Sequence, residues 1–314
     1  MKLNSILGSG ATAFVNAVRS NNKSEHYEKA MKANNGQISF REDIHEYRNV
    51  QSKEVYISVT TIIGQYQKKF HNEYWSLYKA LEIIVSQSYG KQYWYAVKNK
   101  LKSYRDNDNE DEAVVYMHSF IEKNKLNHAY AKAEHFKKQW KDKSDKASEK
   151  GTDYHNKKEA ESYSNGYDTI NSMRVPTALT YSFDLSKLED GFHAELLLYN
   201  DYYKVSGKAD KVIIKTIDGK RLVYIDDYKT NENIKKKNEF QTFKAPLQHL
   251  DDCDWNKYKL QLTMYGVLLE LAGYEVVHTQ LTHVTPFGEF PEPFDMMRNE
   301  VYTILDERAK KLYS

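Results

Sequence analysis

The sequence predicts an α/β protein: a mixed sheet of about four strands flanked by helices, with a helical elaboration toward the N-terminus. The strongest observation lies in residues 207–230, where two β-branched runs joined by Asp218-Gly219 are typical of an antiparallel hairpin. Residues 60–150 instead show aromatic and apolar side chains at helical spacing. Strands therefore dominate the second half of the chain, and helices the first.

Composition limits the classes of function. The formal net charge of +2 over 314 residues is too balanced to indicate a nucleic-acid partner, so any basic surface must be local. The single cysteine, Cys253, excludes an internal disulfide framework and a four-cysteine zinc or iron–sulfur site. No segment approaches the roughly 18 apolar residues of a membrane span. We expect a soluble cytoplasmic protein.

Residues 1–37 are small and polar, and we interpret them as a weakly anchored N-terminal extension. The first 24 residues contain no Asp or Glu, which is also a feature of targeting peptides. The apolar core that a secretory signal needs is interrupted by Gly8 and Gly10. A polar leader helix is therefore the preferred interpretation.

Residues 38–150 form the second predicted region, a short hairpin followed by aromatic-rich helices. An acidic segment at 105–112 separates two helical blocks, and 132–150 is a Lys-rich helix that we interpret as a solvated face. Aromatic side chains here could stack on unpaired bases in an arch that holds DNA. The alternative is a half-buried core in which each Tyr hydroxyl reaches the surface.

Residues 151–314 form the third predicted region. Gly151 is expected to break the preceding helix, and Thr152 to cap a new one. His155 and Glu159 are four residues apart and share one face of that helix. The elements expected beyond it are a linker near 164–180, a strand over 192–199, the 207–230 hairpin, a helix capped by Asp254 and running over 255–271, a strand over 276–284 and a C-terminal helix from about 295.

The second strand of the 207–230 hairpin ends in charged residues. Side chains alternate along a strand, so Asp227 and Lys229 project from one face and Asp226 from the other. Asp210 lies on the apolar face of the first strand. Because core strands seldom bury Asp and Lys without a partner, a divalent cation between the carboxylates would explain them. The alternative is an edge-strand ion pair worth under about 1 kcal/mol.

Four short motifs occur in a fixed order along the chain. They are Gly151-Thr152-x-x-His155, Gly207-x-x-Asp210, Asp227-Tyr228-Lys229-Thr230 and Gln261-x-x-x-Tyr265. As an ordered set they resemble the RecB-like branch of the PD-(D/E)XK nuclease superfamily. The segment 56–63 is similar to the entry segment of the phage-type and mitochondrial single-strand exonucleases of that branch.

The resemblance implies a restriction-endonuclease-like core with one or two Mg²⁺ or Mn²⁺ ions and no iron–sulfur cluster. Asp210 and Asp227 supply carboxylate oxygens, which suit these cations. The resemblance implies His155 and the backbone carbonyl of Tyr228 as further ligands. The resemblance also implies Lys229 and Gln261 as catalytic residues, and Thr230 and Tyr265 as contacts to nucleic acid.

The predicted function is metal-dependent hydrolysis of DNA phosphodiester bonds, with single-stranded DNA or DNA ends as substrate. The exonucleolytic mode rests on the resemblance. A structure-specific endonuclease on the same core, or an inert DNA-binding protein that keeps the fold, are the alternatives. Glu195 could support the site or lie at a strand end, and Glu159 is expected to support the site.

Overall fold

The computed structural model describes residues 25–31, 38–170, 173–178, 182–239 and 241–314. The proposed leader helix within residues 1–24 lies outside the described residues. The chain forms two compact units, one from residues up to Lys68 together with those from Asp153 onward, and one from Lys69–Thr152. Residues 38–68, which the sequence analysis grouped with the helical region, thus pack in the first unit.

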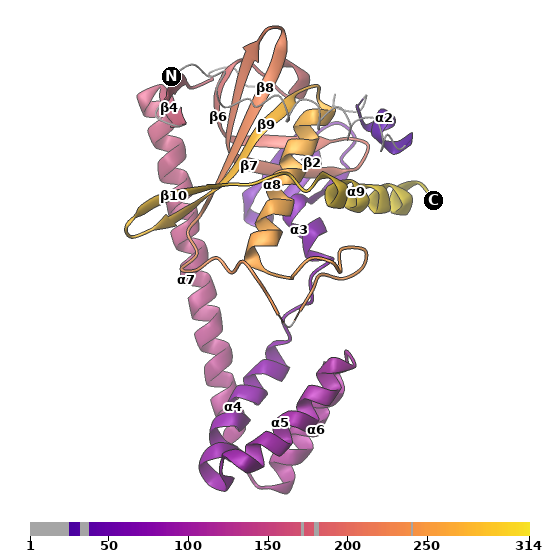
Figure 1. The fold of residues 1–314 in the computed structure, drawn as a ribbon, viewed down its shortest axis with the longest axis vertical. Helices are drawn as coiled ribbons and strands as arrows, with labels where there is room; N and C mark the ends of the chain where they lie inside the picture. Colours follow the sequence, from indigo (N-terminus) through magenta and orange to yellow (C-terminus); the bar gives the residue numbers. More distant parts are fainter. Residues whose placement is uncertain (1–24, 32–37, 171–172, 179–181, 240) are drawn as a thin grey trace. The chain divides into compact units, whose positions relative to one another are not determined.

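The first unit is built on a mixed sheet of eight strands, so the prediction of about four was too low (Figure 1). The strand order is β1-β2-β3-β7-β8-β9-β10, and β6 also pairs with β7. The β3–β7 and β8–β9 pairs are parallel and the others antiparallel. The strands are β1 (Ile38–Arg41), β2 (Glu46–Asn49), β3 (Val55–Ser58), β6 (Gly191–Asn200), β7 (Val205–Ile217), β8 (Lys220–Lys229), β9 (Glu275–Thr285) and β10 (Gly288–Pro293).

The predicted central hairpin is confirmed as β7 and β8. Ile217 pairs with Lys220, which leaves a two-residue loop of Asp218 and Gly219. Both loop residues have positive φ, 50° and 74°. This conformation matches the twist of the flanking strands and is the one that Asp-Gly adopts readily.

Helix α8 (Asp254–Leu271) packs against one face of this sheet, and its residues from Leu260 to Leu271 are all buried (Figure 1). The apolar positions predicted to share a face with the charged hairpin residues lie in this core, namely Val212, Ile214, Val223 and Ile225. The other helical elements of the first unit are α2 (Glu25–Met31), η2 (Glu42–Ile44), α3 (Val59–Gly64), η3 (Leu185–Lys187) and α9 (Arg298–Tyr313).

The second unit is helical and has a hydrophobic core of its own. It contains α4 (Asn72–Tyr89), α5 (Lys91–Asp106), α6 (Glu110–Lys123) and the part of α7 (His128–Asn165) that precedes Asp153. Tyr74 and Trp94 are buried in that core, whereas Tyr95 is exposed. The aromatic residues of this region therefore include both core positions and positions accessible to a ligand.

Two local predictions between residues 128 and 180 were wrong. Gly151 does not break a helix and Thr152 does not cap one, because α7 continues through both. An interior glycine costs a helix only about 1 kcal/mol, which the remaining turns of a long helix can offset. The expected linker near 164–180 contains a two-stranded sheet, β4 (Tyr167–Ile170) with β5 (Met173–Pro176).

Gly207 occupies a position where no side chain fits. A Cβ there would lie 2.7 Å from Cε1 of Tyr265 and 3.2 Å from Cγ2 of Val59. Both are parts of packed side chains in the core beneath β7. The glycine of the Gly207-x-x-Asp210 motif thus has a packing function, since it lets α8 approach the strand just before the acidic residue.

We expect Gly207→Ala to lower the free energy of unfolding by about 1–3 kcal/mol, as overpacking does in a filled core. Gly64→Ala is the matched control, because a Cβ at Gly64 meets no atom within 4 Å and the residue ends helix α3. That variant should be neutral or stabilised by about 0.5–1 kcal/mol. Urea unfolding of both variants measures the difference, and equal midpoints would contradict the packing argument.

Candidate metal centre

Three side chains from three elements bring metal-ligating atoms together. His155 of α7, Glu195 of β6 and Asp210 of β7 each place one such atom within 4.8 Å of the other two. Nδ1 of His155 lies 3.2 Å from Oδ2 of Asp210 and 3.5 Å from Oε1 of Glu195. An imidazole nitrogen with carboxylate oxygens suits Mn²⁺, and the oxygens also suit Mg²⁺. The structure thus brings two of the four predicted ligands together and adds Glu195.

Asp210 lies where β7 and β8 separate. The paired register of these strands ends at Lys211 and Asp226, one residue before Asp210 and Asp227 would face each other. The backbone N–H of Tyr228 donates to Oδ2 of Asp210 at 2.8 Å. Since the N–H and C=O of a strand residue point to the same side, we expect the Tyr228 carbonyl to face the Asp210 side as well.

Glu195 lies opposite Asp210 across the β6–β7 pair. The two residues fall between the register pairs Leu196↔Ala209 and Ala194↔Lys211, and the register is the same on either side of them. Glu195 has φ 48°, a left-handed conformation that costs an L-residue roughly 1–2 kcal/mol. Strained residues of this kind concentrate at functional sites. The side chain is only 15% exposed and forms an ion pair with Lys208 at 2.9 Å.

Asp227 and Lys229 lie at the end of β8 and form an ion pair with each other. Asp227 is 1% exposed, and among the residues that the structure describes neither of its carboxylate oxygens accepts a hydrogen bond of regular geometry. The Lys229 ammonium also lies 4.9 Å from the centre of the Tyr258 ring. Asp227 is not within the three-residue group, but its charge helps to raise the pKa of His155.

The pKa values of the clustered residues are shifted by burial and by one another's charges. Burial lowers the pKa of His155, but Asp210 and Glu195 more than offset this and raise it to about 10. Burial raises the pKa of Glu195, yet the cations of His155 and Lys208 bring it down to about 2. Burial and the charge of Asp210 raise the pKa of Asp227 to about 7 despite Lys229. The protonated imidazole of His155 and the ammonium groups of Lys208 and Lys229 thus roughly balance the three carboxylates.

Gln261 and Tyr265 lie together on α8. The Gln261 amide donates to the Tyr265 hydroxyl at 3.1 Å, and both side chains are buried. Burial and the nearby charge of Asp227 raise the pKa of Tyr265. This burial favours a supporting role for Tyr265 over contact with nucleic acid. Thr230 directly follows β8 and is half-buried.

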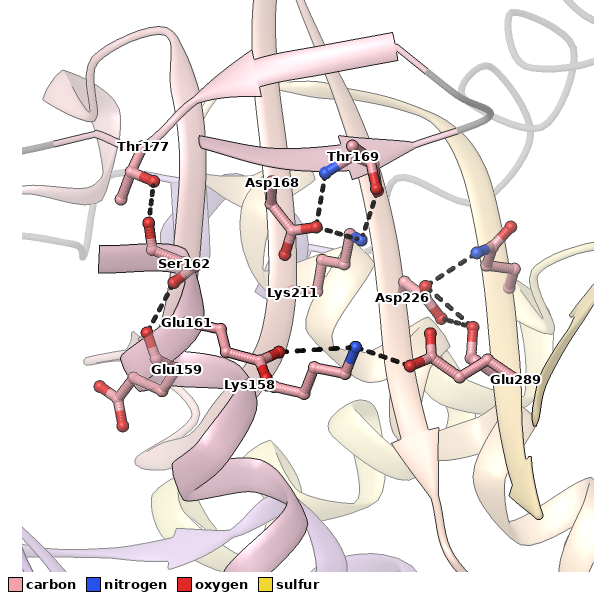
Figure 2. Close-up of polar contacts among 12 residues, drawn as sticks. Lys158, Glu159, Glu161, Ser162, Asp168, Thr169, Thr177, Lys211, Asp226 and Glu289 are labelled. Carbon is pink, nitrogen blue, oxygen red and sulfur yellow. Dashed lines mark hydrogen bonds and ion pairs between the residues drawn. The ribbon is translucent and has the colours of Figure 1, made fainter. Parts of the chain in front are cut away.

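The opposite side of β8 carries a separate polar network (Figure 2). Asp226 accepts hydrogen bonds from Gln280 at 2.8 Å and from Thr282 at 2.8 Å. The buried ammonium of Lys211 binds Asp168 and the carbonyl of Thr169 in β4. Each acceptor and donor here is matched by protein groups, which agrees with a structural role for Asp226.

Sequence reasoning left the role of Glu195 open, and no local signal decides it. Its strand reads as an ordinary apolar run, and only the pairing of β6 with β7 places it opposite Asp210 and beside His155. Lys208, the cation that pairs with Glu195, was not singled out at all. The Gly207-x-x-Asp210 motif contains Lys208, so its position next to the acid could have drawn attention to it.

We expect Glu195→Gln to weaken Mn²⁺ binding at least about tenfold, because the isosteric amide keeps the packing but removes the charge. Glu159→Gln is the matched control, since Glu159 lines the same pocket but lies outside the three-residue group. Isothermal titration with Mn²⁺ measures both. Equal losses in the two variants would show that Glu195 acts only through the general field of the site.

None of the described helices is long and apolar enough to cross a membrane. The site described above lies entirely within the first unit, on elements from α7, β6, β7, β8 and α8. In comparisons with known proteins, no protein-family model, no curated protein and no solved structure matches this chain.

Proposed function

We propose that this protein is a metal-dependent DNA nuclease of the PD-(D/E)XK type that hydrolyses phosphodiester bonds, acting as an exonuclease on single strands or DNA ends. One observation carries the proposal. The cluster of His155, Glu195 and Asp210 lies beside the Asp227–Lys229 pair where β7 and β8 separate. A metal-ligand set next to a lysine is the arrangement that this hydrolysis needs.

The residues present fit a divalent cation. His155, Glu195 and Asp210 bring one ligand atom each within 4.8 Å of the others, and burial and the charge of Asp210 raise the pKa of Asp227 beside them. A divalent cation that replaced the proton of His155 would stabilise the charge of these acids. When bound, such an ion would stabilise charge on a phosphoryl oxygen and lower the pKa of a water molecule. His155, Glu195, Asp210 and Asp227 would hold it.

The ammonium of Lys229 supplies the second part of the chemistry. Burial lowers the pKa of Lys229, but Asp227 and Asp210 outweigh this and raise it, so the side chain stays cationic. It therefore acts as a hydrogen-bond donor and positive charge rather than as a general base. Gln261 donates its amide to the Tyr265 hydroxyl, and in the proposed mechanism it orients a phosphate oxygen or water.

A proton on the His155 imidazole competes with a metal ion for Nδ1. The raised pKa of His155 means that the imidazole carries a proton at neutral pH when no cation is bound. Nδ1 must give up that proton to become a ligand. The two carboxylates that hold the protonated ring in place are thus the groups that orient it for ligation.

The experiment that tests the proposal is digestion of an end-labelled oligonucleotide, single- and double-stranded, with Mn²⁺ and with excess chelator. We expect cleavage only with the ion, faster on the single strand, with products that shorten progressively from one end. A circular single strand of the same sequence should resist. Cleavage of the circle would favour an endonuclease, and full activity in chelator would exclude the metal-dependent mechanism.

A further inference from the structure

The hairpin of β9 and β10 exposes two phenylalanines. Thr285 pairs with Gly288, which leaves Pro286 and Phe287 as a two-residue loop. Phe287 is 91% exposed and Phe290, at the third position of β10, is 50% exposed. Loops of this length normally carry Asn, Asp or Gly. Neither exposed ring belongs to a hydrophobic cluster of the described residues, so packing within the fold does not explain their placement.

Phe290 lies in line with the proposed catalytic lysine. His283 of β9 pairs with Lys229 of β8 on one side and with Phe290 of β10 on the other. Residues paired across adjacent strands project from the same face of a sheet. Phe290 therefore stands on the face that carries Lys229, two strands away from it. The carbonyl of Asn231, from the loop that follows β8, lies 2.8 Å from Nε2 of His283 between them.

Side-chain contacts join the same hairpin to α7, the helix that carries His155. Glu289 accepts a hydrogen bond from the Tyr154 hydroxyl at 2.6 Å and forms an ion pair with Lys158 at 2.6 Å. These two residues flank His155 on α7, and Figure 2 shows Lys158 reaching toward Glu289. The opposite orientation of Glu289 and Phe290 follows from strand alternation. Strand β10, which carries Phe290, is thus joined to the helix that supplies His155.

Exposed positive charge borders this surface. Lys235, Lys236 and Lys237 are all exposed in the loop beyond Lys229. Lys236 pairs with Glu292 of β10 and lies 4.8 Å from the centre of the Trp255 ring, so the basic loop is tied to the hairpin strand. Exposed aromatic rings beside cations are the combination by which proteins bind single-stranded nucleic acid, with bases stacked and phosphates neutralised.

We propose that Phe287 and Phe290 form a base-stacking platform for an unpaired nucleotide of single-stranded DNA, with Lys235–Lys237 beside its backbone. The inference rests on the proposed function, which it deepens by assigning the substrate class to a particular surface. In this arrangement Lys229 lies at the scissile phosphate, and Phe290, two strands away, stacks on the base of a flanking nucleotide. A base paired in a duplex offers no free face to the rings, so the platform selects single strands.

The test compares the full-length protein with Phe287→Ala, Phe290→Ala and the double variant. Affinity for a fluorescein-labelled single-stranded oligothymidylate is measured by anisotropy in excess chelator, and KM and kcat for its cleavage in Mn²⁺. An oligomer of equal length with abasic sites is the matched ligand, because it keeps the phosphates and lacks the bases. Phe183→Ala, which removes an exposed ring outside the hairpin, is the matched variant.

We expect the double variant to bind the oligothymidylate about 5- to 150-fold more weakly, the range that loss of base stacking produces. KM should rise with it while kcat changes little, the abasic oligomer should be unaffected, and Phe287→Trp should bind as wild type. Equal affinity and KM in the double variant would overturn the inference and leave the nuclease intact. A dimer that dissociates in the double variant, with unchanged DNA affinity, would also overturn it. A wild-type protein that neither binds nor cleaves DNA would remove the proposed function itself.

Discussion

Lys229→Ala should reduce cleavage by at least about 10²–10³-fold, the cost of removing one donor that stabilises charge in the transition state. The reason is positional. Lys229 is the cation at the end of β8 that lies beside the acids of the site, and its raised pKa keeps it protonated at neutral pH. The measurement is single-turnover cleavage of an end-labelled single strand in saturating Mn²⁺.

The stability of the same variant separates catalysis from folding. Loss of Lys229 leaves Asp227 buried without its ion-pair partner, so the metal-free variant should lose about 3–5 kcal/mol of unfolding free energy. Added Mn²⁺ should restore much of this without restoring cleavage, and DNA affinity should remain close to that of wild type. Cleavage at the wild-type rate would overturn the assignment of Lys229.

Asp227→Asn and Asp226→Asn should have opposite consequences although the two residues are neighbours. In Asp227→Asn the amide oxygen can still accept from Lys229, but the charge that a divalent cation needs is gone. We expect cleavage and Mn²⁺ affinity to fall at least about 100-fold, with little change in the fold.

Asp226→Asn is the matched control on the other side of the strand. Burial raises the pKa of Asp226, so a neutral side chain is tolerated there, and Thr282 can still donate to the amide oxygen. One hydrogen bond with Gln280 has to rearrange, at a cost of about 1–3 kcal/mol in stability. Activity should be largely retained. If the two variants lose activity equally, the division of roles between the two faces of β8 is wrong.

That division illustrates what a local pattern can predict. Alternation along β8 placed Asp227 and Lys229 on the core face and Asp226 on the other, and the structure confirms both placements. The Asp218-Gly219 loop and the buried helix α8 also follow from short-range rules of turn conformation and periodicity. These features depend on residues within a few positions of one another.

The wrong predictions have more than one cause. The number of strands was too low because the β1–β3 segment joins the sheet through the pairing of β3 with the distant β7, and because β10, which pairs with its neighbour β9, was not predicted. Gly151 lies inside a helix because the whole of α7 outweighs one unfavourable residue. Glu195 reaches His155 because β6 pairs with β7 in the register that places it opposite Asp210. Strand pairing is thus decided between segments, whereas the continuation of α7 depends on the helix as a whole.

The sequence by itself determined the central hairpin, the faces of its acidic residues and the buried helix beside it, since strand alternation and helical periodicity are local properties of the backbone. Only the tertiary structure decided that Glu195 joins His155 and Asp210, that Gly207 admits the Tyr265 ring, and that Phe290 stands in line with Lys229. The physical reason is that strand register and helix docking are set by the packing of the whole core, to which every element contributes at once.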